Sequence, residues 1–265
     1  MLIDSSFEWF YLFLPLLGFL VGLLVTTFGG GGGFFYVPAL TIFFGVPTQI
    51  AVATSLASII PTTISGSLSH YKENNVNIPI GLILGMGGIF GALLGTYISS
   101  QISPDLLGRL FGILMIALVI PMALSSRRRA RNAGDKVIYT EKITPRKGVL
   151  GSLFGLLSGT MAGMFGISGT PPVIAGLYIL GLPAPSVVGT SIFILLFNAV
   201  SGLFGHIALG QFDLKLVVLL CSGSVVGAYL GPNLLGRIDS KNLERVFGPL
   251  FILIMFLMGL VMAFR

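Results

Sequence analysis

Charged residues are scarce in this chain of 265 residues: only 9% are Asp, Glu, Lys or Arg, whereas 54% are hydrophobic. A soluble domain carries about 25% charged residues. This composition therefore excludes an ordinary soluble enzyme, a disordered chain and a nucleic-acid-binding module, so no nucleic-acid partner is expected. The mean hydropathy of +0.99 is typical of a helical protein that crosses a lipid bilayer several times.

Two long stretches contain no charged residue at all, namely the 63 residues of 9–71 and the 65 residues of 148–212. At about 20 residues per crossing, each stretch has room for about three membrane helices. A membrane β-barrel would instead show alternating segments of about ten residues, and these stretches do not alternate. Cys221 is the single cysteine, which excludes an intramolecular disulfide and a cysteine-based metal cluster.

Basic residues concentrate in one stretch between the two apolar regions. The positive-inside rule places such a loop in the cytoplasm, so we predict a multi-pass protein of the plasma (inner) membrane with a cytoplasmic loop at 126–147. The N-terminus carries Asp4 and Glu8 but no basic residue, so we expect its first apolar segment to be retained rather than cleaved as a signal peptide. Eight of the fifteen Lys and Arg residues lie in the loop: Arg127, Arg128, Arg129, Arg131, Lys136, Lys142, Arg146 and Lys147.

The two apolar regions align with each other at a constant offset. GVPTQIAVATS begins at Gly45 and GLPAPSVVGTS begins at Gly181, 136 positions later. We infer an internal duplication, with a first transmembrane repeat at 1–125, the basic loop at 126–147 and a second repeat at 148–265. The same offset relates further motifs: Thr54-Ser55 and Thr190-Ser191, Ser65-Gly66 and Ser201-Gly202, His70 and His206, Gly91-Ala92 and Gly227-Ala228.

Each repeat is predicted to contain five helical segments, which makes the chain an all-α polytopic membrane protein. The second segment of each repeat is too short for a full crossing at 1.5 Å per residue. Ten crossings would give an inverted-topology repeat with both termini outside, whereas re-entrant second segments would give eight crossings with both termini inside. We favour ten, because inverted repeats explain how one site alternates between two faces. The segments lie near 10–28, 34–44, 47–70, 77–100 and 106–125, and near 149–165, 170–180, 184–207, 214–235 and 244–264.

Glycine-rich breaks precede the short second segment of each repeat. The first is the run 29–33 and the second is Gly-Ile-Ser-Gly-Thr-Pro-Pro at 166–172. Irregular backbone is tolerated in a membrane only inside protein or beside a water-filled cavity, and a helix that starts there presents backbone N–H groups and a positive dipole end. Gly32, Gly33, Ser168 and Gly169 are therefore candidate anion-binding residues, although close helix packing also uses small residues.

Hydroxyl groups recur beside these breaks and form the second set of candidates. Their O–H groups are suited to donate to an anion, but they can equally bond to a carbonyl one turn earlier in their own helix. One amide lies midway along its segment and is costly there without a partner, so it either lines the path or bonds across helices. The candidates are Thr54, Ser55, Ser65, Thr190, Ser191, Ser201 and the amide of Asn198.

His70 and His206 end equivalent long segments and are the only histidines of the chain. If transport is coupled to protons, they are the natural titratable groups or gates. Otherwise each is an interfacial histidine at a helix C-terminus, where a positive charge is favourable. The remaining ligands of a zinc site are missing, so we expect no metal and no cofactor.

The order and spacing of these motifs resemble the sulfite exporter TauE/SafE family, also called the four-toluene sulfonate uptake permease family. Each repeat carries a glycine-rich break, a short helix, G-[VL]-P with a downstream Thr-Ser, then Ser-Gly, the His and G-A-x-x-G. The resemblance covers nearly the whole chain except the basic loop, and the second break departs from a plain glycine run at Phe165, Ile167 and Ser168. It implies an integral plasma-membrane transporter of small sulfur-containing anions or organic acids.

We therefore predict a non-enzymatic secondary transporter that moves anions such as sulfite, thiosulfate or organosulfonates by alternating access around a midplane site. The partners expected are this small anion and the lipid bilayer, and the sequence leaves open whether the chain forms a homo-oligomer. The alternative is a passive channel for anions or small solutes. A membrane enzyme would need a nucleophile, acid or metal set that the sequence lacks, and an anchoring subunit would not explain duplicated breaks.

Overall fold

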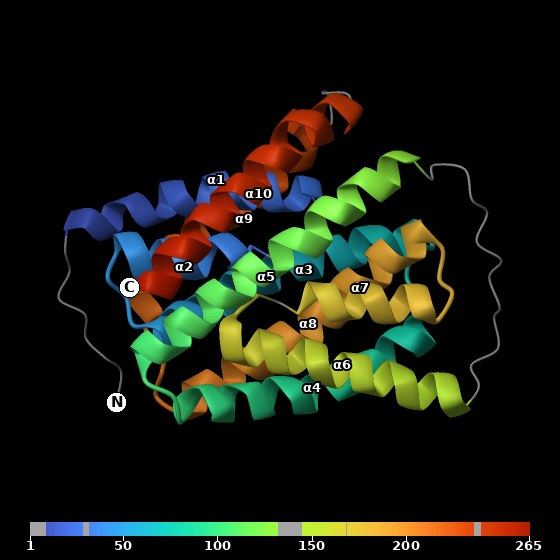
Figure 1. The fold of residues 1–265 in the computed structure, drawn as a ribbon, viewed down its shortest axis with the longest axis horizontal. Helices are drawn as coiled ribbons and strands as arrows, with labels where there is room; N and C mark the ends of the chain where they lie inside the picture. Colours follow the sequence, from blue (N-terminus) through green and yellow to red (C-terminus); the bar gives the residue numbers. More distant parts are fainter. Residues whose placement is uncertain (1–8, 29–31, 132–144, 168, 236–239) are drawn as a thin grey trace.

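The chain folds into a bundle of helices (Figure 1). The computed structural model describes residues 9–28, 32–131, 145–167, 169–235 and 240–265, and no strand occurs among them. The all-α prediction is confirmed. The elements are η1 (Trp9–Phe13), α1 (Leu14–Phe28), α2 (Gly33–Phe43), α3 (Thr48–Lys72), α4 (Ile78–Ser100), α5 (Pro104–Arg131), α6 (Pro145–Phe165), α7 (Thr170–Ile179), α8 (Ala184–Ala208), α9 (Leu214–Leu235) and α10 (Ser240–Phe264).

Four helices in the described ranges, α3, α4, α6 and α8, are long and apolar enough to cross a membrane by length and composition. Large apolar side chains lie exposed on their outer faces, among them Phe90 at 63% and Phe204 at 68%. A soluble protein would not leave so many such side chains in water. Together with the composition, this surface identifies a multi-pass membrane protein.

The helix boundaries recur at the offset found in the sequence. Thr48 and Ala184, which start α3 and α8, lie 136 positions apart, and so do Lys72 and Ala208, which end them. The short helices α2 and α7 have 11 and 10 residues. At 1.5 Å per residue they are about 15 Å long, roughly half the hydrocarbon thickness of a bilayer. The prediction of short second segments is confirmed.

Helices extend into both ends of the predicted basic loop at 126–147. α5 continues beyond residue 125 to Arg131, and α6 already begins at Pro145. The remaining loop residues, 132–144, lie outside the described part of the chain.

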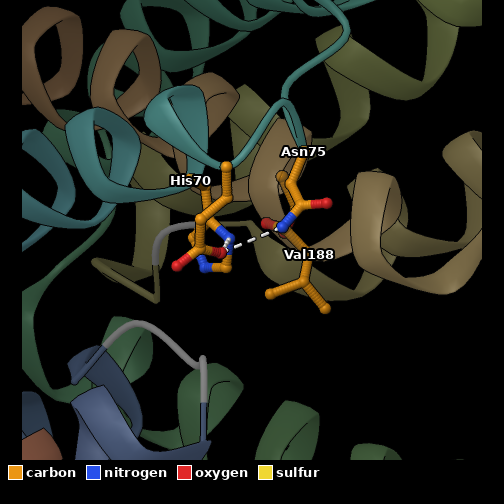
Figure 2. A network of polar contacts seen from close by, with 5 residues as sticks. His70, Asn75 and Val188 are labelled. Carbon is orange, nitrogen blue, oxygen red and sulfur yellow. Dashed lines mark hydrogen bonds and ion pairs between the residues drawn. The ribbon is translucent and has the colours of Figure 1, made fainter.

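The long helices α3 and α8 end in the same kind of cap. Beyond α3, Asn74 adopts a left-handed conformation (φ 56°), and the N–H of Asn75 donates to the carbonyl of His70 at 2.9 Å. This pattern is the Schellman cap, which satisfies the last carbonyls of a helix. Gly210 (φ 71°) takes the same place after α8. Figure 2 shows the α3 cap, with His70 and Asn75 beside Val188 of α8.

Helices of one repeat pack mainly on helices of the other. α1 lies against α9, α4 against α6, α5 against α10, and α3 against α8. In Figure 1, α4 and α6 run along one side of the molecule, and α1 lies on the opposite side. Because α1 corresponds to α6 and α4 to α9 under the offset, the first two pairings are equivalent to each other.

The α3–α8 pair crosses in antiparallel orientation. A Cβ placed on Gly66 would lie 3.1 Å from Ile192, whereas one on Gly202 would lie 3.0 Å from Leu56. The late part of α3 therefore faces the early part of α8, and the early part of α3 faces the late part of α8. The equivalent helices α3 and α8 thus run in opposite directions.

Glycines allow the backbones of α4 and α6 to come into direct contact. A Cβ on Gly91 would overlap the carbonyl oxygen of Leu156, and one on Gly159 would overlap that of Gly88. Association in a membrane depends on such close packing, because lipid is as apolar as the side chains. These glycines are therefore packing residues of the interface between the repeats.

A Gly159→Ala variant should be less stable than the wild type by about 1–3 kcal/mol, because the new methyl group meets backbone atoms that have no rotamer with which to move away. The matched control is Gly148→Ala on the same helix, where a Cβ has no neighbour within 4 Å. Thermal unfolding of both purified variants in detergent measures the difference. Equal midpoints for Gly159→Ala and Gly148→Ala would show that α4 and α6 are not this closely packed.

Candidate functional site

The two glycine-rich breaks meet inside the molecule. Gly33 is the first residue of α2, and a Cβ on it would overlap the carbonyl oxygen of Gly166 and lie 2.7 Å from the Cα atom of Ile167. Gly166 has φ +68°, a conformation that side chains with a Cβ rarely adopt. Glycine is therefore needed on both sides of this contact, for space at Gly33 and for backbone conformation at Gly166.

Helix α3 holds the second break from one side. The hydroxyl of Ser55, which is completely buried, donates to the carbonyl of Gly166 at 3.0 Å. Val37 of α2 and Val52 of α3 pack against the Cα atom of Gly166, each so close that an added Cβ would lie 3.1 Å away. A predicted site residue of the first repeat thus contacts the break of the second repeat.

Helices α6 and α8 hold the same break from the other side. Ser158 of α6 donates to the carbonyl of Gly169 at 2.8 Å, and the side-chain amide of Asn198 on α8 donates to the Ser158 hydroxyl at 2.7 Å. Both polar side chains are completely buried. We refer to Gly33, Ser55, Ser158, Gly166, Gly169 and Asn198 together as the central junction.

The central junction is built from neutral groups. Among the residues whose burial the structure describes, the buried polar side chains are those of Thr, Ser, Gln and Asn, apart from His206 and Asp213 at helix ends. Two break carbonyls are already occupied by Ser55 and Ser158. The junction is therefore uncharged, and two of its carbonyls already accept hydrogen bonds from side chains.

The two Thr-Ser pairs do not come together in one cluster. Because α3 and α8 are antiparallel, Thr54 lies near the end of α8 and Thr190 near the end of α3. The hydroxyl of Thr54 bonds to the carbonyl of Ile50 one turn earlier, at 2.8 Å. Thr190 instead accepts the N–H of Asn77, the N-cap of α4, at 2.9 Å.

The other predicted residues are spread around the junction. Ser191 and Ser201 bond to carbonyls of their own helix, those of Val188 and Phe197, at 2.8 and 2.7 Å. Ser65 is exposed on α3. Gly32 is the buried N-cap of α2, while Ser168 and residues 29–31 lie outside the described part of the chain.

Comparison with known proteins agrees with this architecture. The sequence model of the family described as "Sulfite exporter TauE/SafE" matches residues 14–262. The chain belongs to the TauE/SafE sulfite exporter family. The resemblance noted from the motifs is thereby confirmed.

Relatives in this family are described as membrane transporters. The probable membrane transporter protein YdhB of Bacillus subtilis is 31% identical over 235 residues, which cover 86% of this chain and 92% of YdhB. The probable membrane transporter protein YunE of the same organism is 28% identical, over 92% of this chain and 95% of YunE. The probable membrane transporter protein MJ0441 of Methanocaldococcus jannaschii is 29% identical, over 92% and 94%. No solved structure matches the chain significantly.

The two histidines of this TauE/SafE protein have different surroundings. His206 is completely buried, with Nε2 2.8 Å from the carbonyl oxygen of Gly163 and Nδ1 2.8 Å from Oε1 of Gln211. The His70 side chain is 27% exposed, and its Nδ1 lies 3.7 Å from a carboxylate oxygen of Glu73. They lie at opposite ends of the α3–α8 crossing, so they form two separate sites.

Ser158 and Asp213 are among the buried polar residues that the sequence did not identify. Ser158 stands among small residues of α6, and nothing in its local sequence distinguishes it from a packing residue. Asp213, only 3% exposed, accepts the N–H of Leu216 at 3.3 Å as the N-cap of α9. Its equivalent, Asn77, caps α4 in the same way, so the repeat offset combined with the N-cap preference for Asp and Asn identifies this pair.

Proposed function

We propose that this protein is a secondary transporter of small sulfur-containing anions such as sulfite, thiosulfate or organosulfonates. The observation that carries the proposal is the central junction, where Gly33 of one repeat touches Gly166 of the other. Broken helices whose N-termini lie at the interface of two repeats are the usual architecture of substrate sites in secondary transporters. The family description, which names sulfite, supports this class of substrate.

A neutral site suits an anion that must be released after each crossing. Backbone N–H groups at a helix N-terminus and hydroxyl groups bind anions through dipoles. A buried Lys or Arg would cost several kcal/mol in the membrane and would hold the anion more tightly. The neutral character of the junction therefore favours exchange over permanent binding.

The packing of the repeats supports alternating access by an inverted-topology repeat. Equivalent helices α3 and α8 run antiparallel, and the equivalent pairs α1–α9 and α4–α6 join the repeats on opposite sides of the molecule. Rocking of these two units around the junction would expose it to one face and then to the other. A passive channel needs no such exchange of states.

Counterflow in proteoliposomes tests this function against the channel. Purified protein is reconstituted in liposomes loaded with unlabelled sulfite, thiosulfate, methanesulfonate or acetate, and uptake of radiolabelled anion is followed. A transporter shows saturable uptake that is accelerated by the same anion inside. Uptake that neither saturates nor responds to internal anion would identify a channel, and uptake of acetate alone would contradict the sulfur-containing substrate class.

The basic loop is proposed to face the cytoplasm of a cell whose plasma membrane holds the protein. We expect Ala133→Cys, in a background in which Cys221 is replaced by Ala, to resist an impermeant thiol reagent in intact cells. The same cysteine should react after the membrane is permeabilised. Rapid labelling in intact cells would show that the loop is outside and that the orientation is reversed.

A further inference from the structure

One hydroxyl group at the start of α7 has no hydrogen-bond partner. Thr170 is the first residue of this helix and is only 8% exposed, yet its Oγ1 atom is buried and unbonded. Other buried hydroxyls around the junction, those of Thr54, Ser55 and Ser158, are all bonded. A buried donor without a partner is unfavourable for folding, so its presence calls for a ligand or a functional reason.

The backbone around Thr170 makes this hydroxyl the main side-chain donor at the helix end. The N-cap, Gly169, adopts a left-handed conformation (φ 70°) and supplies no capping side chain. Pro171 and Pro172 follow and have no N–H group. The positive end of the helix dipole therefore remains, but its donors are reduced to few groups, among them the N–H and O–H of Thr170.

Two carbonyls near the start of α7 already receive hydrogen bonds, because Ser158 donates to the carbonyl of Gly169 and Ser55 donates to the carbonyl of Gly166. The Thr170 hydroxyl itself has no acceptor within hydrogen-bonding reach, so it suits a ligand that offers an acceptor oxygen. A deprotonated oxyanion offers such oxygens, and the positive end of the α7 dipole favours its negative charge and disfavours a cation.

We propose that the Thr170 hydroxyl donates a hydrogen bond to an oxygen atom of the transported anion. This inference rests on the proposed transport function and adds a substrate-binding residue to the central junction. The second repeat, whose break departs from a plain glycine run, thus contributes a side-chain hydroxyl in addition to backbone N–H groups.

The test compares Thr170→Val with Thr170→Ser in the purified full-length protein. Binding of sulfite, thiosulfate and methanesulfonate is measured at constant ionic strength by calorimetry and by the rise in thermal midpoint. Valine keeps the shape but removes the hydroxyl, and a hydrogen bond to a charged group is worth about tenfold or more in affinity. We expect Thr170→Val to lose at least this factor, while Thr170→Ser stays close to the wild type.

Stability separates binding from a structural role. Removing an unpaired buried hydroxyl should leave the thermal midpoint of the unliganded Thr170→Val variant unchanged or higher. The matched control is Thr96→Val, since Thr96 is also buried but donates to the carbonyl of Ala92 at 2.9 Å within α4. This control should lose stability and keep its affinity for the anion.

Three results would overturn the proposal. Wild-type affinity in Thr170→Val would show that the hydroxyl does not contact the anion, and it would leave the transport function intact. A lower midpoint in Thr170→Val would show that the hydroxyl serves folding. Failure of the wild type itself to bind any of the three anions would contradict the proposed function and this inference together.

Discussion

Transport should be lost in a Gly33→Ala variant, although the protein still inserts into the membrane. A single methyl group at this position would overlap the carbonyl oxygen of Gly166 and would press on the Cα atom of Ile167. Both of these atoms belong to the backbone, which cannot rotate away as a side chain can. One of the two breaks must therefore move to make room for the methyl group. Membrane insertion depends on the hydrophobicity of the segments, which this change does not lower.

Gly148 of α6 provides a control, because a Cβ there would have no neighbour within 4 Å. We therefore expect Gly148→Ala to keep much of the wild-type flux, and Gly33→Ala to lose at least about nine-tenths of it, since small displacements at a binding site cost on the order of a hundredfold in rate. Flux is measured in proteoliposomes with equal amounts of inserted protein. Equal flux in the two variants would make the break-to-break contact irrelevant to transport.

The helices of this protein could be predicted from its sequence because their causes are local. Stretches without charge must be helical in lipid, and prolines and glycines delimit them. Pro47 and Pro183 precede α3 and α8 directly. The offset of the duplication then transfers boundaries from one repeat to the other, as the matched starts of α3 and α8 at Thr48 and Ala184 show.

The candidate site could be predicted only in part, because it depends on how the helices cross. Ser55 and Asn198 were identified from local sequence, and the structure places both at the second break. Thr190 was grouped with them because it recurs beside a break, yet its hydroxyl contacts the start of α4. In an antiparallel pair of equivalent helices, equivalent residues lie at opposite ends, so recurrence in the sequence is no evidence of proximity.

The glycine interface between α4 and α6 shows a second limit. The chain contains 37 glycines, and many follow the four-residue spacing that suits membrane helix packing. Which of these stripes face each other is decided by the whole arrangement of helices. Ser158, on the same helix as Gly159, therefore has a role at the second break that only the structure reveals.

The two histidine variants should differ strongly in stability. The carbonyl of Gly163 can only accept, so Nε2 of His206 must carry a proton and donate to it. A His206→Gln variant disturbs this bond and the contact with Gln211 in a fully buried position, and should be destabilised by about 1–3 kcal/mol. His70→Gln, in a partly exposed position, should unfold close to the wild-type midpoint.

Flux at different pH values decides whether either histidine takes part in transport. With ten crossings, His70 lies near the cytoplasmic face and His206 near the outer face, so each would respond to the pH of its own compartment. A histidine side chain changes its charge near neutral pH, whereas glutamine keeps hydrogen-bonding capacity and cannot titrate. If transport is coupled to protons through these residues, His70→Gln should flatten the dependence of flux on internal pH. His206→Gln should flatten the dependence on external pH, with affinity for the anion at high pH retained in both.

The measurement is flux in liposomes with pH set independently on each side and with protein oriented by its basic loop. Unchanged profiles in both variants would show that His206 serves only to join α8 to α6 through Gly163 and that the anion crosses without protonation of either histidine.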